Sequence, residues 1–497
     1  MAARDTPYDI AVVGGGINGC GIARDAAGRG ARVLLLEQGD LATGTSSASS
    51  KLIHGGLRYL EHREFGLVRE ALLEREKLRA IAPHVIWPLH FVLPHVPGLR
   101  SYWLLRAGLF LYDHLGAGTR SPRTRTIRLQ KHPAGTVLRP EYTRALVFSD
   151  CWGDDARLVV LNARDAANRG ADIRTRCRVT AFMREEGGWR ITAGGAEYRA
   201  RALVNAAGPG AVNLLAAGSI ASSHRMRLVR GSHIVTRKLF DHPYPYFLQL
   251  PDRRIFFAIP YEEDFTLIGT TDAEHTGPLD QVQASEEEIA YLCAAANRFF
   301  RQPIGRADVL WSFAGVRPLV HDGSGRPEDA TRGYRLQLSP QSEGAPLLTV
   351  FGGKLTVYRH LAQEAVDLLG RCISLAGQSG WTGAAALPGG DFPADDIDHL
   401  EEQLRERYSF LDARTIRRIA RAYGTFCFTI FGERTSRAEC GRQFGHGLHQ
   451  CEVDYLMARE WARTADDVLW RRTKLGLRFS PAETAALTAY MIREPAA

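Results

Sequence analysis

Tyr8-Asp-Ile-Ala-Val-Val-Gly-Gly-Gly-Ile-Asn-Gly19 is the stretch that decides the fold of this chain. Its apolar run over residues 8–13 predicts a buried parallel strand, and the glycines that follow predict a tight turn. Small and apolar residues at helical spacing predict a helix over 17–27, which Gly28 and Gly30 end. A second apolar strand over 32–36 then ends in Glu37. This order of strand, helix and strand predicts a nucleotide-binding α/β fold.

The glycine turn carries the first chemical signal. Gly14, Gly16 and Gly19 fit the pattern GxGxxG, with Asn18 inside it, and Glu37 ends the next strand where it can bond a ribose. The first glycine allows the turn, the second admits a pyrophosphate, and the third lets the helix approach the strand. The free N–H groups of the helix N-terminus favour the anion. We therefore expect a dinucleotide site rather than a purely structural turn, although these residues alone leave NAD and FAD open.

Length and composition limit the class of protein. At 497 residues the chain predicts two or three domains, and 45% hydrophobic with 24% charged residues is ordinary for a globular protein. The net charge of +8 comes from arginines scattered among acids, without the aromatic and basic stripe of a nucleic-acid site. We expect no nucleic-acid partner. An anionic small substrate or an anionic membrane surface would suit the same charge.

The cysteines and the N-terminus predict the compartment. The eight cysteines lie far apart, without a CxxC pair or metal-ligand spacing, which predicts buried thiols, a reducing compartment and no metal site. The first residues lack the basic, apolar and cleavage regions of a signal peptide. Both observations favour a cytoplasmic protein.

The most apolar window spans residues 103–115. Arg106 and Asp113 interrupt it, and it falls short of the roughly 20 residues that cross a bilayer. We favour a core helix here, with an interfacial helix that dips into lipid headgroups as the alternative.

Patterns farther along the chain predict its division into domains. Residues 157–169 are expected to form a helix, 172–182 a strand and 188–204 a hairpin-like pair, ending in a turn at Gly208 that is aimed at a ligand. Strand alternation then dominates 225–340, around a helix near 285–300, and residues 391–497 are expected to be helical throughout. The predicted domains are a discontinuous nucleotide-binding domain (1–85, 150–225 and 340–388), an inserted antiparallel β substrate domain (86–149 and 226–339) and an all-α C-terminal domain (389–497).

Several longer motifs decide which dinucleotide is bound. They are Gly14-Gly-Gly-Ile-Asn-Gly19, Thr45-Ser-Ser-Ala-Ser-Ser-Lys-Leu-Ile-His-Gly-Gly-Leu-Arg-Tyr59, Asp154-Asp-Ala-Arg157, Gly231-Ser-His233, Ile268-Gly-Thr-Thr-Asp272, Gly315-Val-Arg-Pro318, Phe351-Gly-Gly-Lys-Leu-Thr356 and Asp466-Asp-Val-Leu-Trp-Arg-Arg-Thr473. With them the chain resembles the FAD-dependent glycerol-3-phosphate dehydrogenases of the aerobic, membrane-associated kind. That family belongs to the glutathione-reductase-like flavoproteins. The resemblance covers nearly the whole chain and implies that the cofactor is FAD.

The resemblance also implies which residues hold the cofactor. Ser46, Ser47 and Lys51 are expected along the flavin and its phosphates, and His54 beside the flavin. Gly352 and Gly353 are expected to bring a helix N-terminus near the flavin ring, where backbone dipoles would stabilise the charge of a reduced flavin. The cofactor-binding residues implied in full are Gly14, Gly16, Asn18, Gly19, Glu37, Ser46, Ser47, Lys51, His54, Gly208, Gly352, Gly353 and Thr356.

A phosphorylated substrate needs cations, and loss of a hydride from a carbinol needs a base. Family resemblance implies an anion clamp of Arg58, Arg317, Arg332 and Lys354. Arg317 is favoured because an unpaired charge would be costly in its apolar surroundings. His233 is the candidate base, with Lys354 or a bound water as alternatives. By resemblance only, Tyr59 and Thr270 are expected to hydrogen-bond the substrate.

The function expected from this resemblance is oxidation of sn-glycerol 3-phosphate to dihydroxyacetone phosphate, with electrons passed to a membrane quinone. It implies peripheral contact with lipids on the inner face of the cell membrane, and it allows a homodimer. The C-terminal helices are expected to cap the active site or to mediate dimerisation. The alternatives are an oxidase of the same substrate that uses oxygen, a flavin amine oxidase, and a nucleotide-binding regulatory protein.

Overall fold

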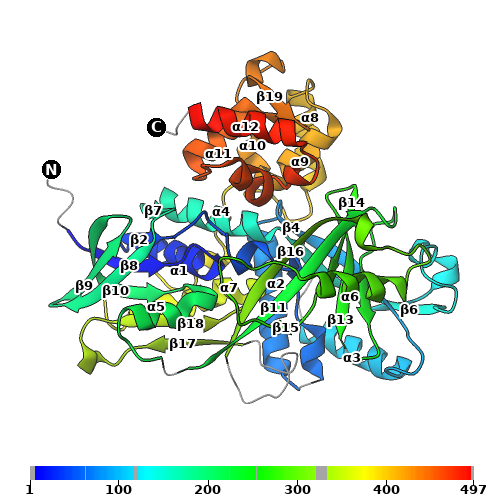
Figure 1. Ribbon diagram of the computed structural model, residues 1–497, viewed down its shortest axis with the longest axis horizontal. Helices are drawn as coiled ribbons and strands as arrows, with labels where there is room; N and C mark the ends of the chain where they lie inside the picture. Colours follow the sequence, from blue (N-terminus) through cyan, green and yellow to red (C-terminus); the bar gives the residue numbers. More distant parts are fainter. Residues whose placement is uncertain are drawn as a thin grey trace.

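The computed structural model describes residues 6–61, 63–116, 121–222, 224–252, 254–320 and 333–493. Two large sheets lie side by side, and a helical domain sits above them (Figure 1). The first sheet has the strand order β17-β18-β10-β1-β2-β7, and its central neighbours run parallel. Its strands are β1 (Tyr8–Val13), β2 (Val33–Leu36), β7 (Asp172–Arg174), β8 (Val179–Glu185), β9 (Gly188–Ala193), β10 (Ala196–Asn205), β17 (Tyr334–Leu338) and β18 (Leu347–Gly352).

The helices of this part pack on the parallel strands. Helix α1 (Ile17–Gly28) contacts both α4 (Asp155–Asn168) and α7 (Tyr358–Leu369). Its Ala23 and Ala26 are fully buried, so small side chains permit close packing on the sheet. The strand expected over 172–182 is instead two strands, β7 and β8, because the chain leaves the sheet after Arg174 and returns as a hairpin with β9.

The second sheet has ten strands and is antiparallel except where β4 meets β12. Helix α2 (Phe65–Ile81) contacts β4, and α6 (Glu286–Asn297) contacts β11 and β14. The strands are β3 (Leu52–Ile53), β4 (Ile86–Pro94), β5 (Arg125–Arg128), β6 (Arg144–Gly153), β11 (Met226–Arg237), β12 (Tyr246–Gln249), β13 (Ile255–Tyr261), β14 (Phe265–Gly269), β15 (Ala273–Glu274) and β16 (Val309–Val320). The domain boundaries given above remain our proposal for dividing these elements.

The apolar window at 103–115 forms helix α3 (Tyr102–Leu115) on the surface. The expectation of a core helix is wrong for most of it, since Trp103 is 77% exposed, and Leu104 and Phe110 are each 62% exposed. Only one side of α3, including Leu105 and Leu109, is buried, against α2 and its neighbours. Within the described ranges, no helix is both long enough and apolar enough to cross a membrane.

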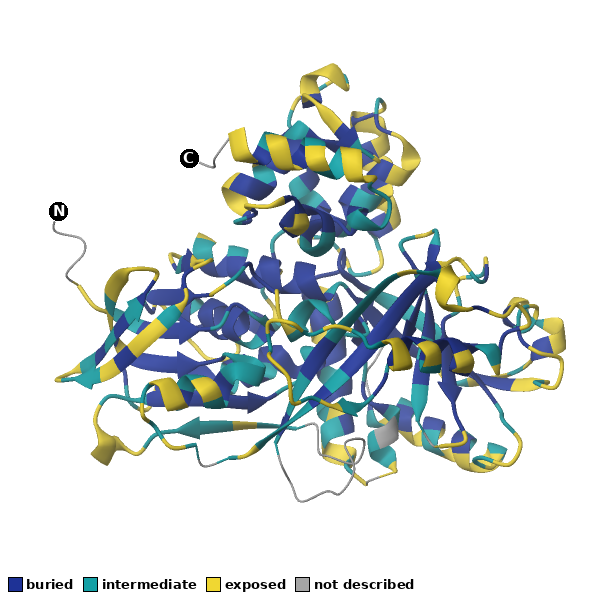
Figure 2. Cartoon of the chain, viewed as in Figure 1, coloured by how far each residue is buried: buried dark blue, intermediate teal, exposed yellow. Residues whose placement is uncertain are grey.

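The C-terminal domain has its own hydrophobic core, visible as buried inner faces beneath an exposed outer layer (Figure 2). Its helices are α8 (Ile397–Arg407), α9 (Ala413–Tyr423), α10 (Cys427–Phe431), α11 (Gln450–Arg459) and α12 (Pro481–Arg493). The expectation of helices throughout is wrong in one place, where β19 (Gln443–Gly445) and β20 (Leu448–His449) form a small hairpin. A π-helical turn, Asp467–Arg472, contacts α4 of the first part of the chain.

Candidate active site

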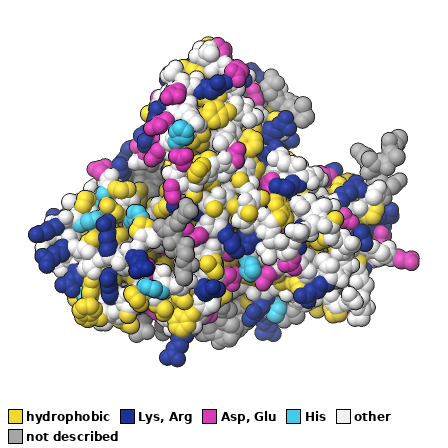
Figure 3. Space-filling model, turned by 180° about the vertical axis from the view of Figure 1, so that it is seen from behind, with side chains coloured by type: hydrophobic (Ala, Val, Ile, Leu, Met, Phe, Trp, Pro, Cys, Tyr) yellow, Lys and Arg dark blue, Asp and Glu magenta, His cyan; other side chains and the backbone are white. Residues whose placement is uncertain are grey.

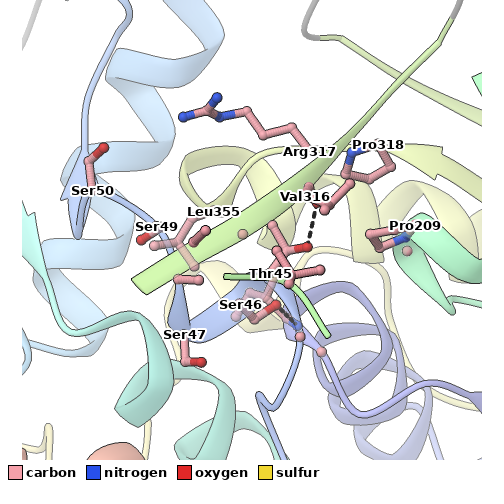
Figure 4. Close-up of a pocket in the computed structure, with 18 of the residues that line it drawn as sticks. Thr45, Ser46, Ser47, Ser49, Ser50, Pro209, Val316, Arg317, Pro318 and Leu355 are labelled. Atoms are coloured by element: carbon pink, nitrogen blue, oxygen red, sulfur yellow. Dashed lines mark hydrogen bonds between the residues drawn. The ribbon is translucent and has the colours of Figure 1, made fainter. Parts of the chain in front are cut away.

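One cavity of about 1620 Å³ extends from the glycine turn after β1 to the second sheet. Residues far apart in the sequence line it together, as Figure 4 shows for Thr45, Ser50, Pro209, Arg317 and Leu355. Most residues predicted for the site line this cavity. They are Gly14, Gly16, Asn18, Glu37, Ser46, Ser47, Lys51, His54, Tyr59, Gly208, Thr270, Arg317, Gly352, Gly353, Lys354 and Thr356.

The glycine turn has the geometry of a pyrophosphate cradle. Gly14 has a φ of +116°, and a Cβ there would lie 2.5 Å from the carbonyl oxygen of Ala206. A Cβ on Gly19 would lie 1.9 Å from the carbonyl oxygen of Gly14, so this glycine lets α1 approach the turn without lining the cavity. Asn18 donates to the Gly352 carbonyl at 3.1 Å, and its buried Oδ1 has no hydrogen-bond partner among the described residues. These features fit a bound dinucleotide.

Glu37 lies at the carboxyl end of β2, as predicted. Its carboxylate accepts hydrogen bonds from the backbone N–H groups of Gly15 at 2.6 Å and Gly39 at 2.7 Å. Burial raises the pKa of Glu37, while these two backbone donors oppose that rise. The carboxylate is therefore held rigidly at the cavity wall, where a ribose hydroxyl would find an acceptor.

The serine-rich loop that begins at Thr45 lies beside the glycine turn. Ser46 accepts from the N–H of Ile17 at 3.0 Å, and Thr45 donates to the Val316 carbonyl at 2.6 Å, so the loop joins the two sheets (Figure 4). Lys51 is completely buried, and its Nζ bonds Asp155 Oδ1 at 2.7 Å. Burial lowers the pKa of Lys51, which the Asp155 carboxylate opposes. Asp155 was not assigned from the sequence, although it lies in one of the quoted motifs.

The cationic side of the cavity centres on Arg317, which lies on β16. Its guanidinium donates to Asp272 Oδ1 at 2.7 Å and to Thr270 Oγ1 at 2.7 Å. It lies against Gly231, where a Cβ would come within 2.2 Å of the guanidinium. On the same cavity wall, the Lys354 ammonium lies 3.7 Å from the centre of the Tyr59 ring. The cavity therefore offers a phosphorylated substrate two cations and two hydroxyl-bearing side chains.

Other predicted residues lie near the turn that leads to α7. The His54 N–H donates to Thr356 Oγ1 at 3.2 Å. Gly352 and Gly353 come just before that turn, with φ values of +77° and +99°. Arg332 and the side chain of Arg58 lie outside the described residues.

His233 on β11 is placed differently from the expectation. It is 1% exposed and does not line the cavity, whereas Ser50, whose Oγ is 2.9 Å from His233 Nε2, does line it. The imidazole stacks on Phe313, with ring centres 4.9 Å apart and planes 10° apart. Burial, followed by the charges of Arg317 and Lys51, holds the pKa of His233 well below its ordinary 6.5. The ring is therefore neutral at pH 7.

The C-terminal domain supplies part of the cavity wall, through two residues that were not assigned to the site from the sequence. Trp470 and Lys474 line the cavity, and Trp470 stacks on Trp311 with ring centres 4.5 Å apart. Trp311 in turn contacts Phe313 at 4.7 Å between ring centres. The rings of Trp470, Trp311, Phe313 and His233 thus form a continuous series, which we call the ring stack. Two roles were expected for this domain, capping the active site and mediating dimerisation, and these contacts fit the role of a cap.

Comparison with known proteins agrees with this geometry. Residues 9–359 match the family model described as FAD dependent oxidoreductase. The chain belongs to this family. FAD is therefore its cofactor, and the cradle of Gly14, Gly16 and Glu37 is where the described residues fit it. Residues 381–492 match a second model, described as the C-terminal domain of alpha-glycerophosphate oxidase.

Individual relatives cover almost the full chain. A "Glycerol-3-phosphate dehydrogenase" of Pseudomonas aeruginosa is 51% identical over 98% of this chain and 95% of its own. A "D-erythritol 1-phosphate dehydrogenase" of Brucella abortus is 47% identical over 99% of this chain and 98% of its own. The glycerol-3-phosphate dehydrogenase of Bacillus halodurans, solved with FAD, superposes with a TM-score of 0.75 at 25% identity, covering 99% and 95% of the two chains. The predicted fold class is confirmed.

Proposed function

We propose that this enzyme oxidises sn-glycerol 3-phosphate to dihydroxyacetone phosphate. The observation that carries the proposal is the pairing of the FAD cradle with the cations Arg317 and Lys354 in one cavity. A dianionic phosphate beside these cations would hold the carbinol next to the cofactor. The names of the Pseudomonas and Bacillus relatives support this choice of substrate.

The reaction needs a hydride acceptor, a proton acceptor and a phosphate anchor. Bound FAD supplies the first, taking the hydride and its electron pair. Arg317, which Asp272 and Thr270 orient, would attract the phosphate with its cationic guanidinium, and Lys354 would act as a second cation. His233, held neutral by burial, would take the hydroxyl proton, which leaves a carbonyl at the oxidised carbon.

The test is an anaerobic titration of the purified holoenzyme. Adding glycerol 3-phosphate should bleach the visible absorbance of the bound flavin, whereas glycerol and inorganic phosphate should leave it unchanged. A flavin that dithionite bleaches but glycerol 3-phosphate does not would contradict the substrate.

D-Erythritol 1-phosphate is a second candidate substrate. The Brucella relative that bears this name is 47% identical over nearly the whole chain, so overall similarity does not separate the two polyol phosphates. Both have a phosphate for Arg317 and a carbinol to oxidise. Comparing kcat/KM for the two compounds decides between them. We expect glycerol 3-phosphate to be preferred.

We propose a membrane quinone as the electron acceptor and peripheral attachment at the inner face of the cell membrane. The exposed apolar residues Trp103, Leu104, Phe110 and Leu111 of α3 support this. On the side of the molecule that holds α3, hydrophobic side chains lie among Lys and Arg (Figure 3). The Phe110→Glu variant should lose affinity for anionic vesicles while it still reduces a soluble dye. Unchanged vesicle binding would contradict attachment through α3.

Oxygen is the alternative electron acceptor. The match of residues 381–492 to the C-terminal domain of an oxidase supports this alternative. Peroxide yield in air separates the two acceptors. A quinone-linked enzyme should form little peroxide and should reduce a quinone analogue with a much higher kcat. The amine oxidase alternative has no use for a phosphate anchor.

A further inference from the structure

The candidate base and the cavity are separated by one hydroxyl group. His233 does not line the cavity, and its imidazole is 1% exposed. Ser50 lines the cavity and lies within hydrogen-bond distance of Nε2 of that imidazole, at 2.9 Å. A substrate hydroxyl in the cavity would therefore meet Ser50 before it could reach His233.

We propose that Ser50 is a catalytic residue that relays the substrate's hydroxyl proton to His233. A serine hydroxyl has one hydrogen to donate and two lone pairs to accept with. Ser50 can therefore donate to Nε2 and accept from the substrate hydroxyl at the same time. This inference rests on the proposed function, because it requires a substrate that loses a hydroxyl proton.

The surroundings of Ser50 suit a proton relay and do not suit a serine nucleophile. Within the described part of the chain, Nδ1 of His233 has no hydrogen-bond partner, so no carboxylate orients the ring as in a serine hydrolase. With its hydrogen on Nδ1, the ring offers Nε2 as the acceptor. The charges of Arg317 and Lys51 both act on the ring. Both disfavour a lasting imidazolium, so the proton would be held only briefly.

Packing holds the imidazole in place for this step. Phe313 stacks on one face, and Gly269 lies against the ring so closely that a Cβ there would come within 2.0 Å of it. Ser50 precedes the buried Lys51, whose ion pair with Asp155 anchors the loop. Donor and acceptor are therefore both fixed before substrate arrives, as an efficient proton transfer requires.

The step balances. The substrate O–H bond breaks and its proton bonds to Ser50 Oγ, while the original Ser50 proton bonds to His233 Nε2. The hydrogen on the same carbon leaves with its bonding electrons to the FAD, and the carbon–oxygen bond becomes a carbonyl. Afterwards Ser50 is again neutral, and His233 carries one additional proton that it must release.

The test compares Ser50→Ala, Ser50→Thr and His233→Asn in the anaerobic holoenzyme. Ser50→Ala should lower the rate constant of flavin reduction on the order of a hundredfold, with a much smaller change in substrate affinity. Ser50→Thr keeps the hydroxyl and should restore most of the rate. The double variant Ser50→Ala/His233→Asn should be no slower than the slower single variant, because the two residues act as one unit.

Ser374→Ala is the control, because it makes the same change at an exposed serine that does not line the cavity. It should reduce its flavin at the wild-type rate. A wild-type rate in Ser50→Ala would overturn the relay, as would a double variant in which the two losses multiply.

Two further measurements separate failure of the relay from failure of the proposed substrate. If glycerol 3-phosphate does not bleach the wild-type flavin, the proposed substrate fails, and D-erythritol 1-phosphate becomes the donor for the same variants. Independently of any substrate, ¹⁵N NMR of the histidine-labelled holoenzyme should show one ring resonance that shifts in Ser50→Ala and vanishes in His233→Asn. An unshifted resonance would mean that the hydrogen bond is absent.

Discussion

Arg317 shows how much chemistry one side chain can contribute to this cavity. Its fork is held by Asp272 and Thr270, and its motif was recognised from the sequence. The partner Asp272 was not assigned a role, because hydrogen-bond pairing across strands is not visible in a linear motif. His233 was also recognised, but its position behind Ser50 depends on the register of β11 against β16, where it pairs with Phe313. The residue types could be predicted from the sequence, whereas tertiary packing decides which of them reach the ligand.

Replacing Arg317 with Lys should weaken binding of the phosphorylated substrate specifically. Lysine keeps the charge but loses the planar guanidinium that Asp272 and Thr270 orient, so kcat/KM should fall on the order of tenfold to a hundredfold, mainly through KM. Steady-state kinetics with a soluble dye measures this. The control is Arg184→Lys, whose partner Glu343 is exposed. An unchanged KM would show that Arg317 does not hold the phosphate.

The depressed pKa of His233 predicts how activity and stability depend on pH. The unfolded chain binds a proton on this ring near pH 6.5, whereas the folded enzyme binds it only at much lower pH. The contribution of His233 to stability is therefore present above pH 6.5 and is lost as pH falls toward the folded pKa. For the same reason kcat/KM should stay level on lowering the pH through 6.5 and decline only below it. A decline centred at or above 6.5 would contradict a buried neutral base.

The secondary structure elements differ in how far the sequence predicts them. Strand β1, helix α1 and strand β2 were anticipated almost to the residue, because apolar period and glycine position are local signals. Helix α3 was anticipated as a helix but placed in the core, because its composition cannot show which neighbours cover it. The hairpin of β19 and β20 was missed, since its strands are too short to show alternation.

Gly14→Ala tests the turn that follows β1. A Cβ would clash with the Ala206 carbonyl, and a φ of +116° is strained for alanine. We expect the purified variant to contain much less FAD, at least tenfold weaker in affinity, as measured by visible absorbance and titration. Gly108 lies inside α3 with open space around it, so Gly108→Ala should bind FAD normally and gain about 0.5–1 kcal/mol in stability. Equal FAD content in the two variants would contradict a requirement for glycine at position 14.

Buried ion pairs that no sequence pattern revealed join the C-terminal domain to the nucleotide-binding part of the chain. Asp40, three residues after the ribose-binding candidate Glu37, accepts hydrogen bonds from Arg472 at 2.7 and 2.8 Å and from Arg471 at 2.6 Å. Lys474 lies 3.4 Å from Asp154. The C-terminal domain is thereby attached to the loop beside the cofactor cradle. Such contacts join residues more than 300 positions apart, so only the folded chain shows them.

Asp40→Asn should loosen the C-terminal domain. It removes the closest charged partner of the fully buried Arg472, whose ion pair with Glu460 is longer at 3.8 Å, and this costs about 3–5 kcal/mol. Urea unfolding and limited proteolysis near residues 384–396 measure the loss. Asp241→Asn, at a side chain 98% exposed, is the control and should change stability by less than about 0.5 kcal/mol. Equal stability of both variants would show that the ion pair does not hold the domain.

The stacked indoles of Trp311 and Trp470 lie at the wall of the cavity, one from each side of the domain boundary. Oxidised flavin absorbs light in the range where indole emits, so energy transfer should dim these two rings when FAD enters. The intrinsic tryptophan fluorescence of the enzyme is therefore a probe of this site. Its ultraviolet-excited emission would report cofactor loading and movement of the cap in real time, without any attached dye.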